Sequence, residues 1–199
     1  LAFPEAGLGR KQFYLAAGGA FAAFAMFSLY ASLAGSFIAD FLPWHGPAIS
    51  GGAIAMVLFL SSLTQLSLRR LSLAKTYLAA TVMILMANVL LVLTLHLHSV
   101  ILFALSVIAT AMAHGLALMA GFGKVQEVTH KHNRAAVVST FLVAGYCGSI
   151  FPVMALGWLA DHLGISTAVT LYCAAFMVWA IALFSGFVYL KRRRHALSI

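Results

Sequence analysis

The chain has 199 residues, of which 63% are hydrophobic and only 8% are charged. A soluble domain carries about 25% charged residues because water must wet its surface, so this composition excludes a water-soluble globule and indicates lipid as the main solvent. The net charge of +8 comes from 12 Lys and Arg against four Asp and Glu, and these charges separate the apolar segments.

The uncharged stretches have the lengths of membrane-spanning helices. A helix needs roughly 20 apolar residues to cross about 30 Å of hydrocarbon. Residues 12–39, 41–68, 135–160 and 162–190 hold one helix each, and 76–123 holds two because His96-Leu97-His98-Ser99 interrupts it. The predicted fold class is an all-α membrane protein, a bundle of six transmembrane helices near residues 13–38, 48–68, 75–95, 99–122, 135–160 and 165–190.

The first three spans carry polar side chains at several positions. Ser28, Ser32 and Ser36 lie one helical turn apart in the first span. Such serines either face an aqueous cavity or bond to carbonyls of their own helix, and both interpretations stay open. Gln65 in the second span and Asn88 in the third are typical of hydrogen bonds between helices, worth roughly 0.6 kcal/mol each.

The fourth span carries two stripes with a spacing of four residues. Its polar stripe is Ser106, Thr110 and His114. The stripe of small residues beside it lets a neighbouring backbone approach closely, and consists of Ala109, Ala113, Ala117 and Gly121. We expect the small residues to pack against another helix and the polar stripe to face water. His114 is the best functional candidate because ionisable groups are costly in a membrane and tend to line pathways, with a neutral structural histidine as the alternative.

The fifth span combines three glycines with a proline. Gly145, Gly148, Pro152 and Gly157 all lie in it, and Pro152 removes a backbone hydrogen bond. These residues predict a bent helix with close packing or hinge positions.

No catalytic constellation is visible, and we expect neither an enzyme nor a bound cofactor. No Asp or Glu lies inside a predicted span. The pairs His96/His98 and His130/His132 have a spacing of two, which on a helix directs them to different faces, so we expect no metal site. Cys147 and Cys173 lie within spans, where thiols behave as small apolar groups, and we expect no disulfide.

All basic residues fall on alternate connections. Lys and Arg near span ends stay on the cytoplasmic side of a membrane. These residues are Arg10, Lys11, Arg69, Arg70, Lys75, Lys124, Lys131, Arg134 and 191–194. We therefore expect both termini in the cytoplasm, with residues 1–12 as the end of a linker and 191–199 as a basic tail. In this interpretation the basic charge sets the topology, and nucleic acid is not a partner.

Two segments carry a resemblance to a known family. Arg134-Ala135-Ala136-Val137-Val138-Ser139-Thr140-Phe141, followed by Gly145-Tyr146-Cys147-Gly148, Phe151-Pro152-Val153, Gly157, Asp161 and Gly164, resembles the eleventh helix of major facilitator superfamily (MFS) transporters. Residues 29–37 resemble the seventh helix. Leu68-Arg69-Arg70-Leu71 stands where that family repeats a cytoplasmic Asp/Arg/Gly motif, but lacks its Asp and glycines, which puts a gating salt bridge there in doubt.

The resemblance implies the C-terminal six-helix half of an MFS transporter, built from two inverted three-helix repeats. Spans one and four would then be equivalent and line a substrate cavity. The residues assigned to that cavity are Ser28, Tyr30, Ser32, Gln65, Ser106, Thr110, His114 and Tyr146.

The implied function is secondary active transport of a small organic solute across a cell inner membrane by alternating access. Efflux of an amphipathic or apolar compound is favoured, because the cavity offers hydroxyls and one histidine but no fixed charge. The expected partners are the bilayer, the solute and a missing N-terminal six-helix half, with a second half-sized subunit as the alternative. If transport is coupled to protons, the titrating group is a carboxylate of the missing half or His114. The alternative function is an accessory membrane subunit without its own transport pathway.

Overall fold

The computed structural model describes residues 1–41 and 47–196, except for the side chains of residues 33–41, 47–50, 53 and 194–196. This part of the chain forms six long α-helices and one short 3-10 turn. The elements are α1 (Leu8–Phe41), α2 (Pro47–Leu68), α3 (Leu73–Leu97), α4 (Val100–Val128), η1 (Lys131–Asn133), α5 (Arg134–Leu163) and α6 (Ile165–Ala196). Helix α1 begins within the segment assigned to the linker, and α6 continues into the segment assigned to the tail.

Local sequence explains three of the helix boundaries. His98 adopts a left-handed conformation with φ of 48° after α3. Ser99 then caps α4, where its side chain accepts a hydrogen bond from the Leu102 N–H at 3.4 Å. Gly164 ends α5 with φ of 81°, a conformation that costs least at glycine. The break predicted within residues 96–99 is therefore confirmed as the turn between α3 and α4.

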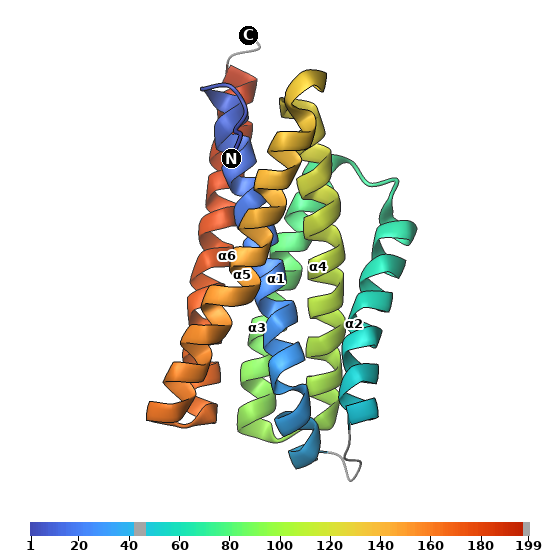
Figure 1. Ribbon diagram of the computed structural model, residues 1–199, viewed down its shortest axis with the longest axis vertical. Coiled ribbons are helices and arrows are strands. Elements are labelled where there is room, and N and C mark those ends of the chain that lie inside the picture. The colour runs from blue at the N-terminus through green and yellow to red at the C-terminus, as the bar shows by residue number, and fades with distance from the viewer. Residues whose placement is uncertain (42–46, 197–199) are drawn as a thin grey trace.

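The six helices form a bundle in which α1 and α4 are central. In Figure 1, α5, α1, α4 and α2 lie side by side nearest the viewer, with α3 and α6 behind them. We call the surface formed by these four helices the near face. Helix α1 contacts every other helix, and α4 contacts α1, α2, α3 and α5. The middles of α1 and α4 are thus the best-enclosed positions of the fold.

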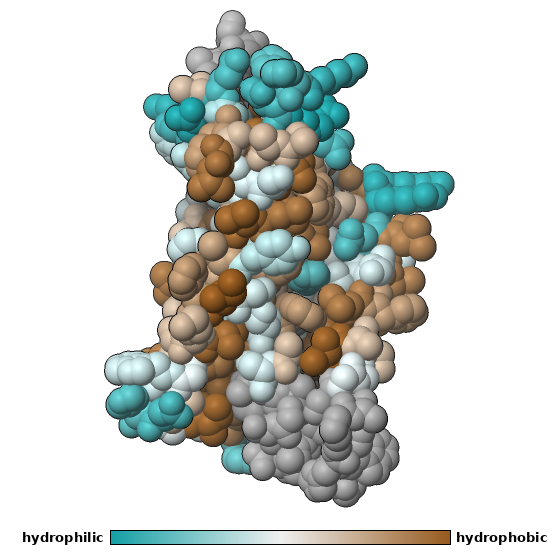
Figure 2. All heavy atoms as spheres, in the orientation of Figure 1, coloured by the Kyte–Doolittle hydropathy of each residue, from teal (hydrophilic) through white to brown (hydrophobic). Residues whose placement is uncertain are grey.

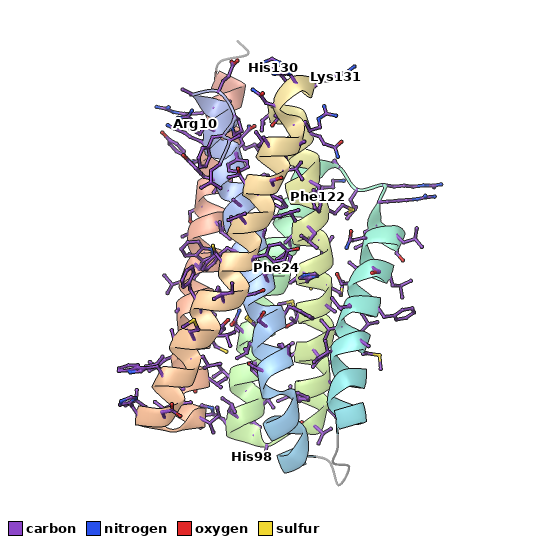
Figure 3. All side chains as sticks on the ribbon, viewed as in Figure 1. Arg10, Phe24, His98, Phe122, His130 and Lys131 are labelled. Atoms are coloured by element: carbon purple, nitrogen blue, oxygen red, sulfur yellow. The ribbon has the colours of Figure 1, made fainter. Side chains whose placement is uncertain are left out.

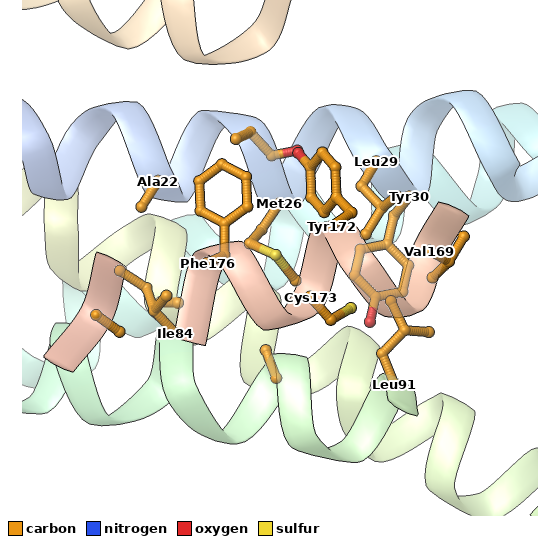
Figure 4. Packing of buried hydrophobic residues seen from close by; sticks show 14 of the residues in the cluster. Ala22, Met26, Leu29, Tyr30, Ile84, Leu91, Val169, Tyr172, Cys173 and Phe176 are labelled. Atoms are coloured by element: carbon orange, nitrogen blue, oxygen red, sulfur yellow. The ribbon is translucent and has the colours of Figure 1, made fainter. Parts of the chain in front are cut away.

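The main core lies where α1, α3 and α6 meet. Met26 and Leu29 of α1 pack with Ile84 of α3 and with Tyr172 and Phe176 of α6 (Figure 4). The Tyr172 hydroxyl donates a hydrogen bond to the Ala25 carbonyl at 2.8 Å, which satisfies the polar end of a buried ring. The cysteines at 147 and 173 are both free thiols.

The outer surface is apolar along most of the bundle. Ile101, Val178 and Phe59 are 72%, 68% and 66% exposed, which suits contact with lipid. Five helices contain a segment that is long and apolar enough to cross a membrane, and α2 adds a shorter apolar stretch, Ile54–Leu68, within the described side chains. Figure 2 shows hydrophilic side chains gathered mainly at one end of the molecule. The chain is therefore an all-α, multi-pass membrane protein.

The basic connections meet at one end of the bundle. Both termini lie at the upper end of Figure 1, together with the connections α2–α3 and α4–α5. Figure 3 places Arg10 and Lys131 at this end and His98 at the opposite one. We call the end that carries both termini the basic end.

Candidate functional site

The site begins where α1 packs against α4, at an interface that we call the central seam. Small residues make the close approach of these helices possible. Ala109 and Ala113 of α4 are buried in the same cluster as Ala22 and Met26 of α1, and Ala117 packs with Ala23 in another. The prediction that the small stripe of α4 packs against a neighbouring helix is confirmed.

A buried hydrogen bond crosses the central seam. The Tyr30 hydroxyl of α1 donates to Ser106 Oγ of α4 at 2.8 Å, and the Ser106 hydroxyl donates to the Phe103 carbonyl at 2.7 Å. One turn further on, the buried Thr110 hydroxyl has no hydrogen-bond partner among the described residues. Ser106 and Thr110 are both 0% exposed. This part of the polar stripe therefore lies inside the protein, whereas the sequence favoured a water-facing stripe.

His114 connects α4 to α2. Its Nδ1 lies 2.9 Å from Ser61 Oγ, and which atom donates depends on the tautomer of the ring. The next residue, Gly115, allows the contact, because a Cβ added there would lie 2.5 Å from the Ser61 carbonyl oxygen. Ser61 and Gly115 were not among the predicted site residues. They lie more than 50 positions apart, so their proximity depends on the tertiary packing of α2 against α4.

Aromatic rings surround His114 on the side of α1. The ring centroid of Phe24 is 5.0 Å and that of Phe27 is 5.5 Å from the imidazole centroid. Phe24 also meets the ring of Tyr146 on α5 edge to face at 5.6 Å. Figure 3 shows Phe24 in the middle of the bundle, between α5 and α4. The group Phe24, Phe27, His114 and Tyr146, which we call the aromatic cluster, thus joins three helices halfway along the near face.

The aromatic cluster reaches the surface of the near face. Tyr146 is 55% exposed while His114 is 5% exposed, so the most exposed member of the cluster is a phenol ring and the imidazole is buried. Phe24 and Phe27 were missed by the sequence analysis because aromatic residues in an apolar helix resemble ordinary core or lipid-facing residues. The one signal available was their spacing on α1, because Phe24 lies four residues before Ser28 and Phe27 lies three residues before Tyr30.

The remaining predicted cavity residues are not brought into this hydrogen-bonded group. Ser28 and Gln65 are half-buried. Ser32 is exposed and donates to the Leu29 carbonyl of its own helix at 3.0 Å, one of the two roles expected for these serines. Ser36 lies outside the described side chains. The polar stripe of α1 is therefore separate from that of α4, except at Tyr30.

The glycines of α5 have different surroundings. A Cβ at Gly148 would overlap the backbone carbonyl of Phe21, and one at Gly145 would lie 3.0 Å from the ring of Phe24. These two glycines therefore let α5 pack closely against α1. Gly157 faces open space, and Pro152 lies inside the continuous helix α5.

Charge and metal ligands are scarce at this site. The four acidic residues are Glu5, Asp40, Glu127 and Asp161, which lie near the ends of the helices or before α1. No group of three metal-ligating side chains occurs among the described residues. The site therefore offers a ligand uncharged groups, namely aromatic faces, hydroxyl groups and one imidazole.

Comparison with protein-family models, with curated protein sequences and with solved structures gives no match. The fold and the site define a multi-pass α-helical membrane protein with an uncharged polar and aromatic site in the middle of its bundle.

Proposed function

We propose that this chain is a six-helix half of a secondary transporter that moves a small, uncharged or amphipathic organic solute by alternating access. The observation that carries the proposal is the pairing of the helices. If α1, α2 and α3 are exchanged with α4, α5 and α6, the contact α1–α5 corresponds to α4–α2, α1–α2 to α4–α5, and α3–α4 to α6–α1. All six of these contacts are present. Many transporter halves are built from inverted three-helix repeats, and such repeats would produce contacts that correspond in this way.

The correspondence between the two triplets of helices is incomplete. Helix α5 contacts α6 and α1 contacts α3, whereas within the described residues α2 makes no contact with α3, and α4 makes none with α6. The same exchange interchanges α1 and α4, the two central helices. These two helices form the central seam and carry most of the aromatic cluster. A site at the interface of two repeats, near the middle of the bilayer, is where transporters bind their substrates.

The proposal predicts a partner for the near face and an orientation of the bundle in the membrane. Transport needs a second six-helix unit that covers the near face, either another half of the same chain or a separate subunit. Because Lys and Arg are retained on the cytoplasmic side, we place the basic end in the cytoplasm of a cell with an inner membrane. The uncharged site favours an apolar or aromatic solute, and export is the direction favoured for such a compound.

His114 is the residue of this half that could couple transport to protons. It is the ionisable group of the aromatic cluster, and ionisable groups inside membranes commonly serve in proton relays. Its contact with Ser61 would change on protonation, because a charged imidazole can only donate hydrogen bonds. In this role, protonation of His114 would change the packing of α2 against α4.

A second function, an accessory subunit without its own pathway, is favoured by one observation. Ser106 and Thr110 are fully buried in the central seam, so this polar stripe is dry in the present arrangement. An accessory subunit would keep it dry in every state. A transporter would expose the surface in front of it, at Ser28 and Tyr146, when the second half moves.

A transport assay separates these two functions. Cells lacking the gene, and cells that carry the full-length protein, would be compared for accumulation of a panel of uncharged, lipophilic fluorescent dyes. We expect the protein to lower accumulation of one or more dyes, Tyr146→Ala to reverse this, and His114→Ala to abolish its dependence on external pH. Val178→Ala, on the lipid-facing side of α6, is the control and should transport normally. Equal accumulation of every dye with and without the protein would favour the accessory subunit.

A further inference from the structure

A cavity of about 470 Å³ lies at the basic end of the bundle, apart from the aromatic cluster. It lies between α1, α3, α4 and α6. Its lining comes from the first turns of α1 and α3 and the last turns of α4 and α6, and includes Leu15, Tyr77, Ala120, Lys124, Phe187 and Lys191. This volume falls in the range of small-molecule binding sites, about 300 to 1,000 Å³.

The interior of the cavity is apolar and aromatic. The rings of Tyr77 and Phe187 stack with their centroids 4.9 Å apart. The Tyr77 hydroxyl is already satisfied, because it donates to the Leu15 carbonyl at 3.1 Å. Leu15, Ala120 and Leu190 add further apolar wall. A ligand portion that enters here therefore needs to be hydrocarbon rather than a polar metabolite.

The rim of the cavity is polar and has an excess of positive charge. Lys124 and Glu127 form an ion pair at 2.6 Å, so their charges offset each other. Lys191 also lines the rim and is exposed. Further cations, Lys11, Lys75 and Arg192, are each adjacent in sequence to a lining residue. The rim thus complements an acidic group beside an apolar chain.

The position of the cavity in the membrane selects one class of ligand. It lies at the end of the bundle that carries the basic connections, where phospholipid headgroups meet the hydrocarbon region. Basic pockets between transmembrane helices at this level bind the headgroups of anionic lipids. We propose that the cavity binds an anionic phospholipid, with one acyl chain against the Tyr77–Phe187 stack and the phosphate at Lys191.

The test is native mass spectrometry of the full chain, released from mixed micelles that contain phosphatidylglycerol and phosphatidylcholine with the same acyl chains. We expect preferential retention of phosphatidylglycerol. A basic residue near an anionic headgroup contributes about 1 kcal/mol, so Lys191→Gln should reduce this preference about fivefold. Arg193→Gln removes the same charge from the same helix, but Arg193 lies over the Tyr189 ring at 5.3 Å and does not line the cavity. The Arg193→Gln variant should therefore retain the preference for phosphatidylglycerol.

A second pair of variants tests the apolar part of the cavity. Ala74 lines the cavity at an exposed position, so Ala74→Trp can block it without disturbing a buried core and should lower retention of phosphatidylglycerol. Leu78→Trp, on the same helix but outside the cavity, should not. Equal retention of the two lipids by the unmodified protein would overturn the proposal, and so would equal losses with Lys191→Gln and Arg193→Gln.

Discussion

At the scale of single residues, the Tyr30 hydroxyl makes the hydrogen bond that crosses the central seam. Tyr30 is 7% exposed and Ser106 is fully buried, so little water can replace this bond if one partner is removed. A buried polar group that loses its partner costs about 1 to 3 kcal/mol, whereas removing both partners together can be nearly neutral. The free energy of unfolding should therefore depend on whether one partner of this bond is removed or both.

The first prediction uses this asymmetry. In the double variant Ser106→Ala/Thr110→Val, the first change removes the acceptor of the Tyr30 hydroxyl, and the second removes the next hydroxyl of α4, which could otherwise replace that acceptor. The Tyr30 hydroxyl is then buried and unpaired, and the free energy of unfolding should fall by about 1 to 3 kcal/mol. Adding Tyr30→Phe to this variant should recover most of the loss. Reversible unfolding in detergent micelles measures both changes, with the exposed Ser32→Ala as a control expected to have little effect. A further loss on adding Tyr30→Phe would contradict the account.

The sequence predicts single residues of the site but not the residues that they contact. The predicted residues Tyr30, Ser106, Thr110 and His114 are all buried on α1 and α4, but their partners could not be assigned from periodicity. The contact between Ser61 and His114 requires α2 to lie beside α4. Spacing within one helix cannot reveal that, because it describes each helix alone.

At the scale of helices, the glycines of α5 determine how closely it approaches α1. Gly145 and Gly148 face Phe24 and Phe21 of α1, whereas Gly157 faces open space. From the sequence alone, these glycines and Pro152 form one group of hinge or packing positions. The structure separates them: the first two pack, and Gly157 has no neighbour that requires a small residue.

The second prediction compares two glycines of this helix. Gly148→Ala should lower the free energy of unfolding by about 1 to 3 kcal/mol, because the added methyl group forces α5 away from the α1 backbone. Gly157→Ala should be neutral or stabilising by up to about 1 kcal/mol, because alanine is the better helix former. Thermal unfolding of the two variants in the same detergent measures the difference. Equal effects would show that α5 does not pack on α1 through Gly148.

Helix number and boundaries were largely accessible from the sequence because they depend on local properties. The charged residues delimit the apolar stretches, and the polar group at residues 96–99 coincides with the left-handed turn at His98. The position of α3 and α6 behind the near face, and the cavity at the basic end, depend on contacts between distant segments. Those contacts leave no periodic signal in a single chain.

At the scale of the whole molecule, the bundle is asymmetric in charge from end to end and in chemistry from face to face. One end gathers both termini and the connections α2–α3 and α4–α5 (Figure 1). The near face carries the aromatic cluster, and α3 and α6 form the back. If the near face is covered by a second six-helix unit, the bundle presents an uncharged site to that interface, and in the proposed orientation its cationic end faces the cytoplasm.

The most direct test of the central claim, that the near face lines a water-filled pathway, is labelling of single cysteines with a water-soluble maleimide. Ser28→Cys and Gln65→Cys would be made in the full-length protein with Cys147→Ala and Cys173→Ala, and labelled in native membranes. We expect both to react, while Val178→Cys on α6, 68% exposed in the bundle but facing lipid, stays protected. Protection of Ser28→Cys and Gln65→Cys to the same degree as Val178→Cys would contradict the transport pathway and leave the accessory subunit as the better account.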